Sequence, residues 1–157
     1  MSAPTGTPTQ RLAALGLALP TVATPLAAYV PAVRVGDLVF TSGQLPTVDG
    51  RVEAVGLVGG EVSPELAQAC ARTCVLNALA AAASVAGSLD AVVRIVKVTG
   101  FVASAPGFTG HPGVVNGASE LLGAVFGEAG AHARSAVGVA SLPLGAPVEV
   151  ELVVSLV

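Results

Sequence analysis

Two valine-rich runs near the C-terminus, with a turn of Pro and Gly between them, limit most strongly how this chain can fold. The runs cover Ser135–Ser141 and Val148–Val157, and the turn covers residues 142–147. Proline fixes φ and glycine permits positive φ, so both residue types are typical of turns. Valine favours extended backbone. The pattern predicts two β-strands, paired as a hairpin.

Three charged residues flank this turn. Arg134 opens the first run, and Glu149 and Glu151 alternate in the second. Side chains two residues apart share a face of a strand, so both carboxylates are expected on one side. A guanidinium can pair with a carboxylate of its own chain or with a small anionic ligand. The residue types alone leave both interpretations open.

The strand register of the predicted hairpin separates these charges. If Ser141 pairs with Val148, then Glu149 lies opposite Ala140, and Arg134 is six residues further along its strand. Six residues span about 20 Å at ~3.3 Å per residue. One subunit could hardly bring Arg134 and Glu149 together, whereas two subunits could. The register therefore favours a site at a subunit interface.

Composition supports an assembly of several copies. Only 11% of the 157 residues are charged and 53% are hydrophobic, whereas a typical soluble domain is about 25% charged. The two long uncharged stretches, Leu12–Val33 and Val98–Ser119, are interrupted by Pro and Gly. Neither resembles the ~20 apolar residues of a membrane span. Residues 1–10 lack Lys and Arg, so we expect no signal peptide and a cytoplasmic protein that buries an apolar face in a homo-oligomer.

Several classes of function find little support. The seven Lys and Arg residues are scattered, the net charge is −3 and there are five aromatic residues, so nucleic-acid binding is not expected. Cys70 and Cys74 are expected to lie on a helix and to be small apolar residues of the protein core. His111 and His132 have no acidic partners at metal-ligand spacing, so both are expected on loops or the surface, and no metal site is predicted.

The order of elements predicts one α+β domain. Residues 1–9 are expected to be loose, followed by a single domain over residues 10–157. A short helix is expected over Gln10–Leu17. The expected strands are Ala28–Val35, Leu38–Thr41, a short strand over Ala54–Val58, a buried strand over Ala91–Ser104 and the two runs near the C-terminus.

The two longer helices have clear termini. Ser63-Pro64-Glu65 combines a capping hydroxyl, a first-turn proline and an acid, which predicts a helix that runs to Ala86 and stops at Gly87. A second helix is expected over Val114–Gly127. Both should pack on one face of a mixed sheet. Gly43, in Ser42-Gly43-Gln44 after a strand, indicates an unusual dihedral or a close approach of another group.

Five segments of the chain form a recognisable set. They are Tyr29 with Gly36; Phe40-Thr41-Ser42-Gly43-Gln44-Leu45-Pro46; Val96-Lys97-Val98-Thr99-Gly100-Phe101-Val102; Asn116; and residues 133–143 together with Val148-Glu149-Val150-Glu151. Taken together and in this order, these segments resemble the Rid proteins, the reactive-intermediate deaminases that are also called YjgF-like or endoribonuclease L-PSP. The similarity spans about residues 28–157 and is closest to a longer branch of that family.

The resemblance implies a chorismate-mutase-like fold and a homotrimer with clefts between subunits. It implies that Arg134 holds the carboxylate of a 2-imino acid, that Glu149 positions and activates water, and that no cofactor is needed. The ligand-binding positions that it implies are Tyr29, Ser42, Gly43, Asn116 and Pro143.

One departure from the family concerns Ala136, where deaminating members commonly have cysteine. This change is expected to reshape the pocket more than to remove a chemical step. The expected function is hydrolysis of reactive 2-imino or enamine acids to 2-keto acids and ammonia. The alternative is a non-catalytic trimer that binds a small carboxylate as a sensor or scaffold. Ribonuclease action is disfavoured by the acidic balance of charges.

Overall fold

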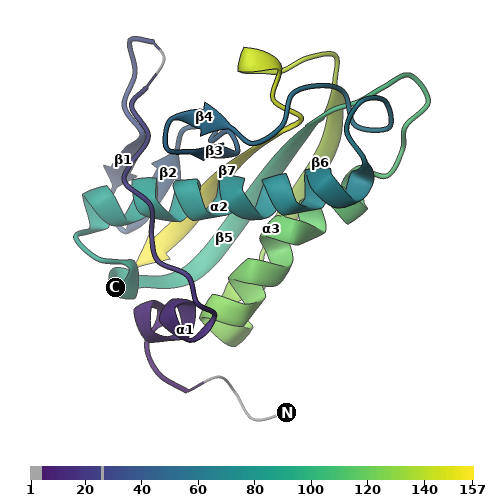
Figure 1. The fold of residues 1–157 in the computed structure, drawn as a ribbon. Coiled ribbons are helices and arrows are strands. Elements are labelled where there is room, and N and C mark those ends of the chain that lie inside the picture. The colour runs from purple at the N-terminus through teal and green to yellow at the C-terminus, as the bar shows by residue number, and fades with distance from the viewer. Residues whose placement is uncertain (1–4, 26) are drawn as a thin grey trace.

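A computed structural model describes residues 5–25 and 27–157 and shows two layers, a curved sheet and the helices that cover one of its faces (Figure 1). The helices are α1 (Pro8–Ala14), α2 (Pro64–Ala86) and α3 (His111–Phe126). The strands are β1 (Ala32–Val35), β2 (Leu38–Thr41), β3 (Thr47–Val48), β4 (Arg51–Val52), β5 (Val92–Ala103), β6 (Ala133–Val139) and β7 (Val148–Leu156). The predicted α+β class, with two main helices on one face of a mixed sheet, is confirmed.

Helix α2 has the predicted termini. The Ser63 hydroxyl accepts a hydrogen bond from the Leu66 amide (3.1 Å), and Gly87 ends the helix in the left-handed conformation. Cys70 and Cys74 are buried as predicted, and burial raises the pKa of the Cys70 thiol to about 11. By length and hydropathy α2 could cross a membrane, but 56% of its apolar 18-residue stretch is buried inside the domain. It is the core helix of this fold.

The five-stranded sheet has the order β1-β2-β7-β5-β6. Strand β5 pairs in parallel with β6 and antiparallel with β7. The predicted hairpin between the last two strands is therefore wrong, because β5 lies between them. The physical reason is the connection through α3: a strand, a helix and a second strand form a right-handed crossover that returns the chain parallel to its start.

The two faces of the sheet differ in what covers them. Along β7, Val148, Val150, Leu152, Val154 and Leu156 are buried beneath the helices, while the intervening residues are part exposed. No described helix packs on the other face, which we call the open face. It carries exposed apolar side chains from three strands, namely Val33, Val35, Leu38, Phe40 and Val137.

Other boundaries differ from the sequence predictions. Helix α1 begins at Pro8 because Thr7 and Gln10 form a capping box, so part of the segment expected to be loose is helical, while residues 1–4 lie outside the described residues. Strand β1 begins only at Ala32. The expected strand over residues 54–58 is wrong, since the β3–β4 hairpin precedes it. Helix α3 begins at His111, three residues before the predicted start at Val114, with Pro112 in its first turn.

Candidate active site

Arg134 lies on β6 at the side of the sheet that faces α3. Its Nη1 donates to Asn116 Oδ1 (2.7 Å) and Ser119 Oγ (3.2 Å), and its Nη2 donates to the Pro112 carbonyl (3.3 Å). Of the five N–H groups of a guanidinium, two find no acceptor among the described residues. The arginine is held in place on one side and has hydrogen-bonding capacity for an anion on the other.

Behind Arg134 lies a chain of hydrogen bonds that starts at His132. The His132 Nδ1 lies 2.6 Å from the Gly130 carbonyl, which can only accept, so this nitrogen carries a proton. In the neutral ring Nε2 then accepts from Ser119 Oγ (2.9 Å). Ser119 is thereby oriented with a lone pair toward Arg134. His132 lies in the loop before β6 and is half-buried, as expected, and the structure adds these two hydrogen bonds.

Glu149 lies on β7 and points to the open face. Its carboxylate packs against Gly43, where any side chain would overlap it. Gly43 has no positive φ, so close approach is the reason for glycine here. Burial, and then the charge of Glu151, raise the pKa of the Glu149 carboxyl above its ordinary 4.5. A carboxylate of raised pKa is a stronger base.

The remaining predicted positions divide between these two groups. Asn116 joins Arg134. Ser42 precedes Gly43, and its hydroxyl donates to the Val30 carbonyl (2.6 Å). Tyr29 and Gly43 line one cavity together with Leu144, the neighbour of Pro143. Pro143 itself begins an exposed 3-10 turn. The predicted site residues of a single chain thus form two separate groups, which we call the Arg134 half-site and the Glu149 half-site.

The two half-sites do not meet within one chain. In the register of the sheet Arg134 lies beside Val98, whereas Glu149 lies beside Phe101, three residues along β5. Two strand spacings and three residues place their Cα atoms roughly 14 Å apart. Odd spacing along a strand puts side chains on opposite faces. Glu151, which pairs with Thr99, shares the face of Glu149. The interpretation that Arg134 forms a salt bridge with Glu149 or Glu151 of its own chain is therefore wrong.

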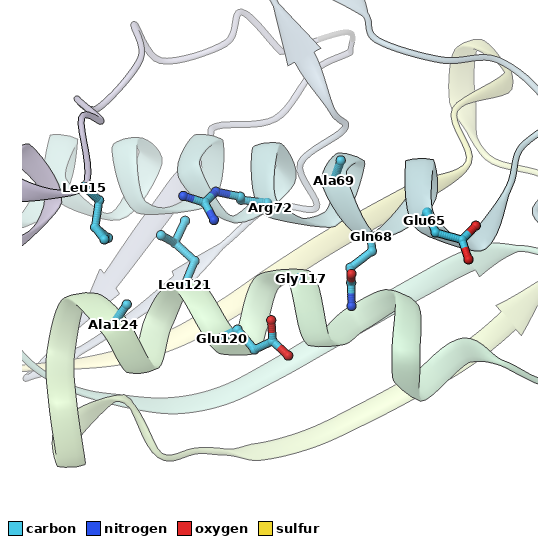
Figure 2. Close-up of a pocket in the computed structure, with 9 residues that line it drawn as sticks. All are labelled: Leu15, Glu65, Gln68, Ala69, Arg72, Gly117, Glu120, Leu121 and Ala124. Atoms are coloured by element: carbon cyan, nitrogen blue, oxygen red, sulfur yellow. The ribbon is translucent and has the colours of Figure 1, made fainter. Parts of the chain in front are cut away.

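Two other polar features are unsuited to catalysis. The Ser104 hydroxyl donates to the Val102 carbonyl (2.9 Å), so the nearby His111 Nε2 (3.0 Å) donates to Ser104 and does not activate it. A pocket of about 240 Å³ lies between α2 and α3 and contains Glu65, Arg72 and Glu120 (Figure 2). None of the predicted site residues line it.

Ser119 and His132 are the functional candidates that sequence reasoning missed. Ser119 is one helical turn beyond Asn116 and therefore shares its face of α3. His132 precedes Arg134 by two residues, which places both side chains on the same side of the extended chain. These two spacings were visible in the sequence, but their meaning depended on the packing of α3 against β6.

Known proteins share both the sequence pattern and the fold of this chain. Residues 9–156 match the family described as "YjgF/chorismate_mutase-like, putative endoribonuclease". Protein TCP17 of Trypanosoma cruzi is 46% identical over 143 residues, which cover 90% of this chain and 89% of TCP17. The chain therefore belongs to the YjgF family and has its α+β, chorismate-mutase-like fold.

Two solved structures extend this comparison. Protein Atu1372 of Agrobacterium tumefaciens, of unknown function, is 43% identical with a TM-score of 0.88, over 96% of this chain and 92% of that chain. E. coli TdcF, solved with bound serine, is 28% identical with a TM-score of 0.59, over 87% of this chain and 98% of that chain.

Proposed function

We propose that this protein hydrolyses 2-imino and enamine acids to 2-keto acids and ammonia, at sites shared between subunits of a homotrimer. The observation that carries this proposal is the division of the two key groups. An anchored guanidinium with free N–H groups lies on one face of the sheet, and a carboxylate of raised pKa lies on the other. Each lacks in its own chain the partner that the reaction requires.

Arg134 is the group that binds the substrate carboxylate. Its planar fork matches a carboxylate in two parallel hydrogen bonds. Asn116 and Ser119 hold the fork from behind, so little side-chain entropy is lost on binding. The fixed carboxylate orients the neighbouring imine carbon for attack.

Glu149 is the general base. It accepts a proton from water while the water oxygen forms a bond to the imine carbon and the C=N π electrons move to nitrogen. The protonated Glu149 then returns this proton to the amine nitrogen of the carbinolamine. Glu149 then takes the hydroxyl proton of the carbinolamine and passes it to the amine nitrogen, so the C–N bond breaks as the C=O bond forms and ammonia leaves. Atoms and charges balance with water as the only co-reactant.

The open face is the surface through which we propose the trimer assembles. Its apolar side chains include Phe40, 44% of which is exposed in one chain. A patch of this kind marks an interaction surface. Glu149 lies on this face and β6, which carries Arg134, is an edge strand of the sheet, so a second chain that lays its β6 edge against the open face can bring its Arg134 to Glu149. Three copies would then close three equivalent sites.

Turnover of imines tests this proposal. We supply 2-imino acids generated in situ from amino acids and follow the release of keto acid and ammonia. Wild type should accelerate release, and Arg134→Ala should lower kcat/KM by about 100-fold or more, the cost of losing a charged bidentate contact. Arg72→Ala is the matched control, because Arg72 is an exposed arginine of α2 that lines the pocket between α2 and α3, which contains none of the predicted site residues. Equal rates of imine hydrolysis for wild type and Arg134→Ala would reject the proposed enzymatic function.

A second candidate is a trimer that binds a small carboxylate without turnover. The serine bound in E. coli TdcF favours it. In this case a carboxylate ligand should raise Tm in wild type but not in Arg134→Ala, with no release of ammonia from any imine supplied.

A further inference from the structure

A cavity of about 630 Å³ adjoins the Glu149 half-site. Its walls come from three parts of the chain: the N-terminal segment 18–25, the turn of the β3–β4 hairpin at residues 47–50, and the outer side of α2. Figure 1 shows this N-terminal segment crossing α2 after it leaves α1. The volume lies within the ~300–1,000 Å³ typical of small-molecule sites.

Asn77 makes the wall at the hairpin rigid. This residue of α2 is 3% exposed, and its Nδ2 donates to the carbonyls of Leu45 (3.1 Å) and Thr47 (3.0 Å). The buried amide therefore ties the chain after Gly43 to the helix. Because buried polar groups of this kind are costly to leave unpaired, these bonds hold the hairpin against α2 at this wall of the cavity.

Gly43 links the cavity to the candidate chemistry. It lines the cavity, and its Cα lies directly against the Glu149 carboxylate. A substrate whose imine carbon lies near a water held by Glu149 has its side chain bonded to that same carbon. One carbon–carbon bond is therefore enough to bring the side chain to Gly43, which is part of the cavity wall.

The walls of the cavity are suited to an apolar group. Val22, Leu45, Val48 and Leu76 contribute aliphatic surface, and among the described residues that line the cavity there is no Lys or Arg. A second anionic group of a ligand would find no cation there. Among the described lining residues, the one carboxylate belongs to Asp49, in the exposed hairpin turn.

Leu144 supplies an independent sign of function. Its φ is +58°, which bulky residues rarely adopt, and 58% of its side chain is exposed in one chain. Both features cost free energy. A hydrogen bond from the Gly56 amide to the carbonyl of the next residue, Gly145 (2.9 Å), holds this turn in place. The strained turn thus holds a large apolar side chain at the wall of the cavity, where an apolar ligand can cover it.

We infer that this cavity receives the substrate side chain, and that the preferred substrates are 2-imino acids with large apolar side chains. The inference rests on the proposed function, since the carboxylate must be held at Arg134. It adds the class of side chain, which neither Arg134 nor Glu149 determines.

Titration calorimetry with stable 2-oxo acids tests the inference. Pyruvate, 2-oxobutanoate and 4-methyl-2-oxopentanoate carry the same carboxylate and increasingly large side chains. Affinity should rise about fourfold for each buried carbon, on the order of 50-fold over the series. Leu144→Gly should reduce this gain, since glycine suits the positive φ and removes the apolar wall.

A matched pair of variants locates the effect. Val48→Phe fills the mouth of the cavity from the hairpin and should flatten the dependence on side-chain size, while Val85→Phe, at an exposed position near the end of α2, should behave as wild type. If all three acids bind with equal affinity and this binding is lost in Arg134→Ala, the carboxylate site is supported and the cavity assignment is overturned. If none binds to wild type, the proposed function fails together with the inference.

Discussion

Arg134 and Glu149 lie on opposite faces of one sheet, with strand β5 between the strands that carry them. No side-chain rotation within the chain can bring a group on one face to a group on the other. A site that uses both must therefore combine the Arg134 of one copy with the Glu149 of another. This relationship leads to the first prediction.

Two inactive variants should restore activity when they assemble together. Arg134→Ala and Glu149→Gln are each expected to be inactive. If they are unfolded together and refolded as a mixture, about a quarter of the interfaces should pair an intact Arg134 with an intact Glu149. Imine hydrolysis should then return to about a quarter of the wild-type rate. A mixture as inactive as its components would place both groups of each site in the same chain.

Ser119 is expected to position Arg134 and not to touch the substrate. Ser119→Ala removes an acceptor from Arg134 Nη1 and removes the hydroxyl that bonds His132 Nε2. KM for the imine, or Kd for a 2-oxo acid, should rise by about 3–10-fold, the size of one typical hydrogen bond, with a smaller change in kcat. Ser119→Thr keeps the hydroxyl and should recover most of the affinity. Equal defects in both variants would point to packing as the cause.

Gly43→Ala should damage activity more than stability. The added Cβ overlaps the Glu149 carboxylate, which is the flexible end of a side chain and can move aside. We expect kcat/KM to fall at least ~10-fold as the base is displaced, while Tm changes by only a few degrees. Gly113→Ala, in the first turn of α3 with open space around its Cβ position, is the control. A fully active Gly43→Ala would argue against Glu149 as the base.

Two glycines of α3 should respond oppositely to alanine. Gly117 faces α2 (Figure 2), and a Cβ there would overlap the backbone of Gln68. Gly117→Ala must push the two helices apart, so we expect a loss of about 1–3 kcal/mol. Gly123 has open space, and Gly123→Ala should gain roughly 0.5–1 kcal/mol from helix propensity. Urea unfolding of both variants measures the difference, and a destabilised Gly123→Ala would contradict it.

Glu149→Gln should abolish turnover yet stabilise the protein near neutral pH. The raised pKa means that the folded state holds the proton of Glu149 more tightly than the unfolded state. Above that pKa the charged form therefore opposes folding, and this cost disappears as the pH falls. We expect Tm at pH 7 to rise by roughly 1–2 °C, a small effect because water screens the part-exposed charge. A gain of the same size at pH 4 would show that charge is not its cause.

The acid limb of the pH–rate profile follows from the same shift. Wild-type kcat/KM should decline as the pH is lowered, with a midpoint above the 4.5 of an ordinary glutamate.

The sequence by itself determined the elements whose signals are local. The Ser63 cap and Gly87 stop define α2, and the alternation of Val148-Glu149-Val150-Glu151 predicts which side of β7 is buried. The resemblance to the Rid proteins led to the family. The cap, the stop and the alternation each depend on residues within a few positions of one another, where capping, backbone dihedrals and period-two burial decide the outcome.

Only the tertiary structure decided how the strands pair and what surrounds the arginine. Ser135–Ser141 and Val148–Val157 are adjacent in sequence, which favours a hairpin, but β6 pairs with β5 through the crossover helix α3. The same packing brings Ser119 and His132 behind Arg134 and puts Glu149 on the other face. Pairing of this kind depends on burying the apolar side of α3 against two strands at once, a gain that no local pattern in the sequence records.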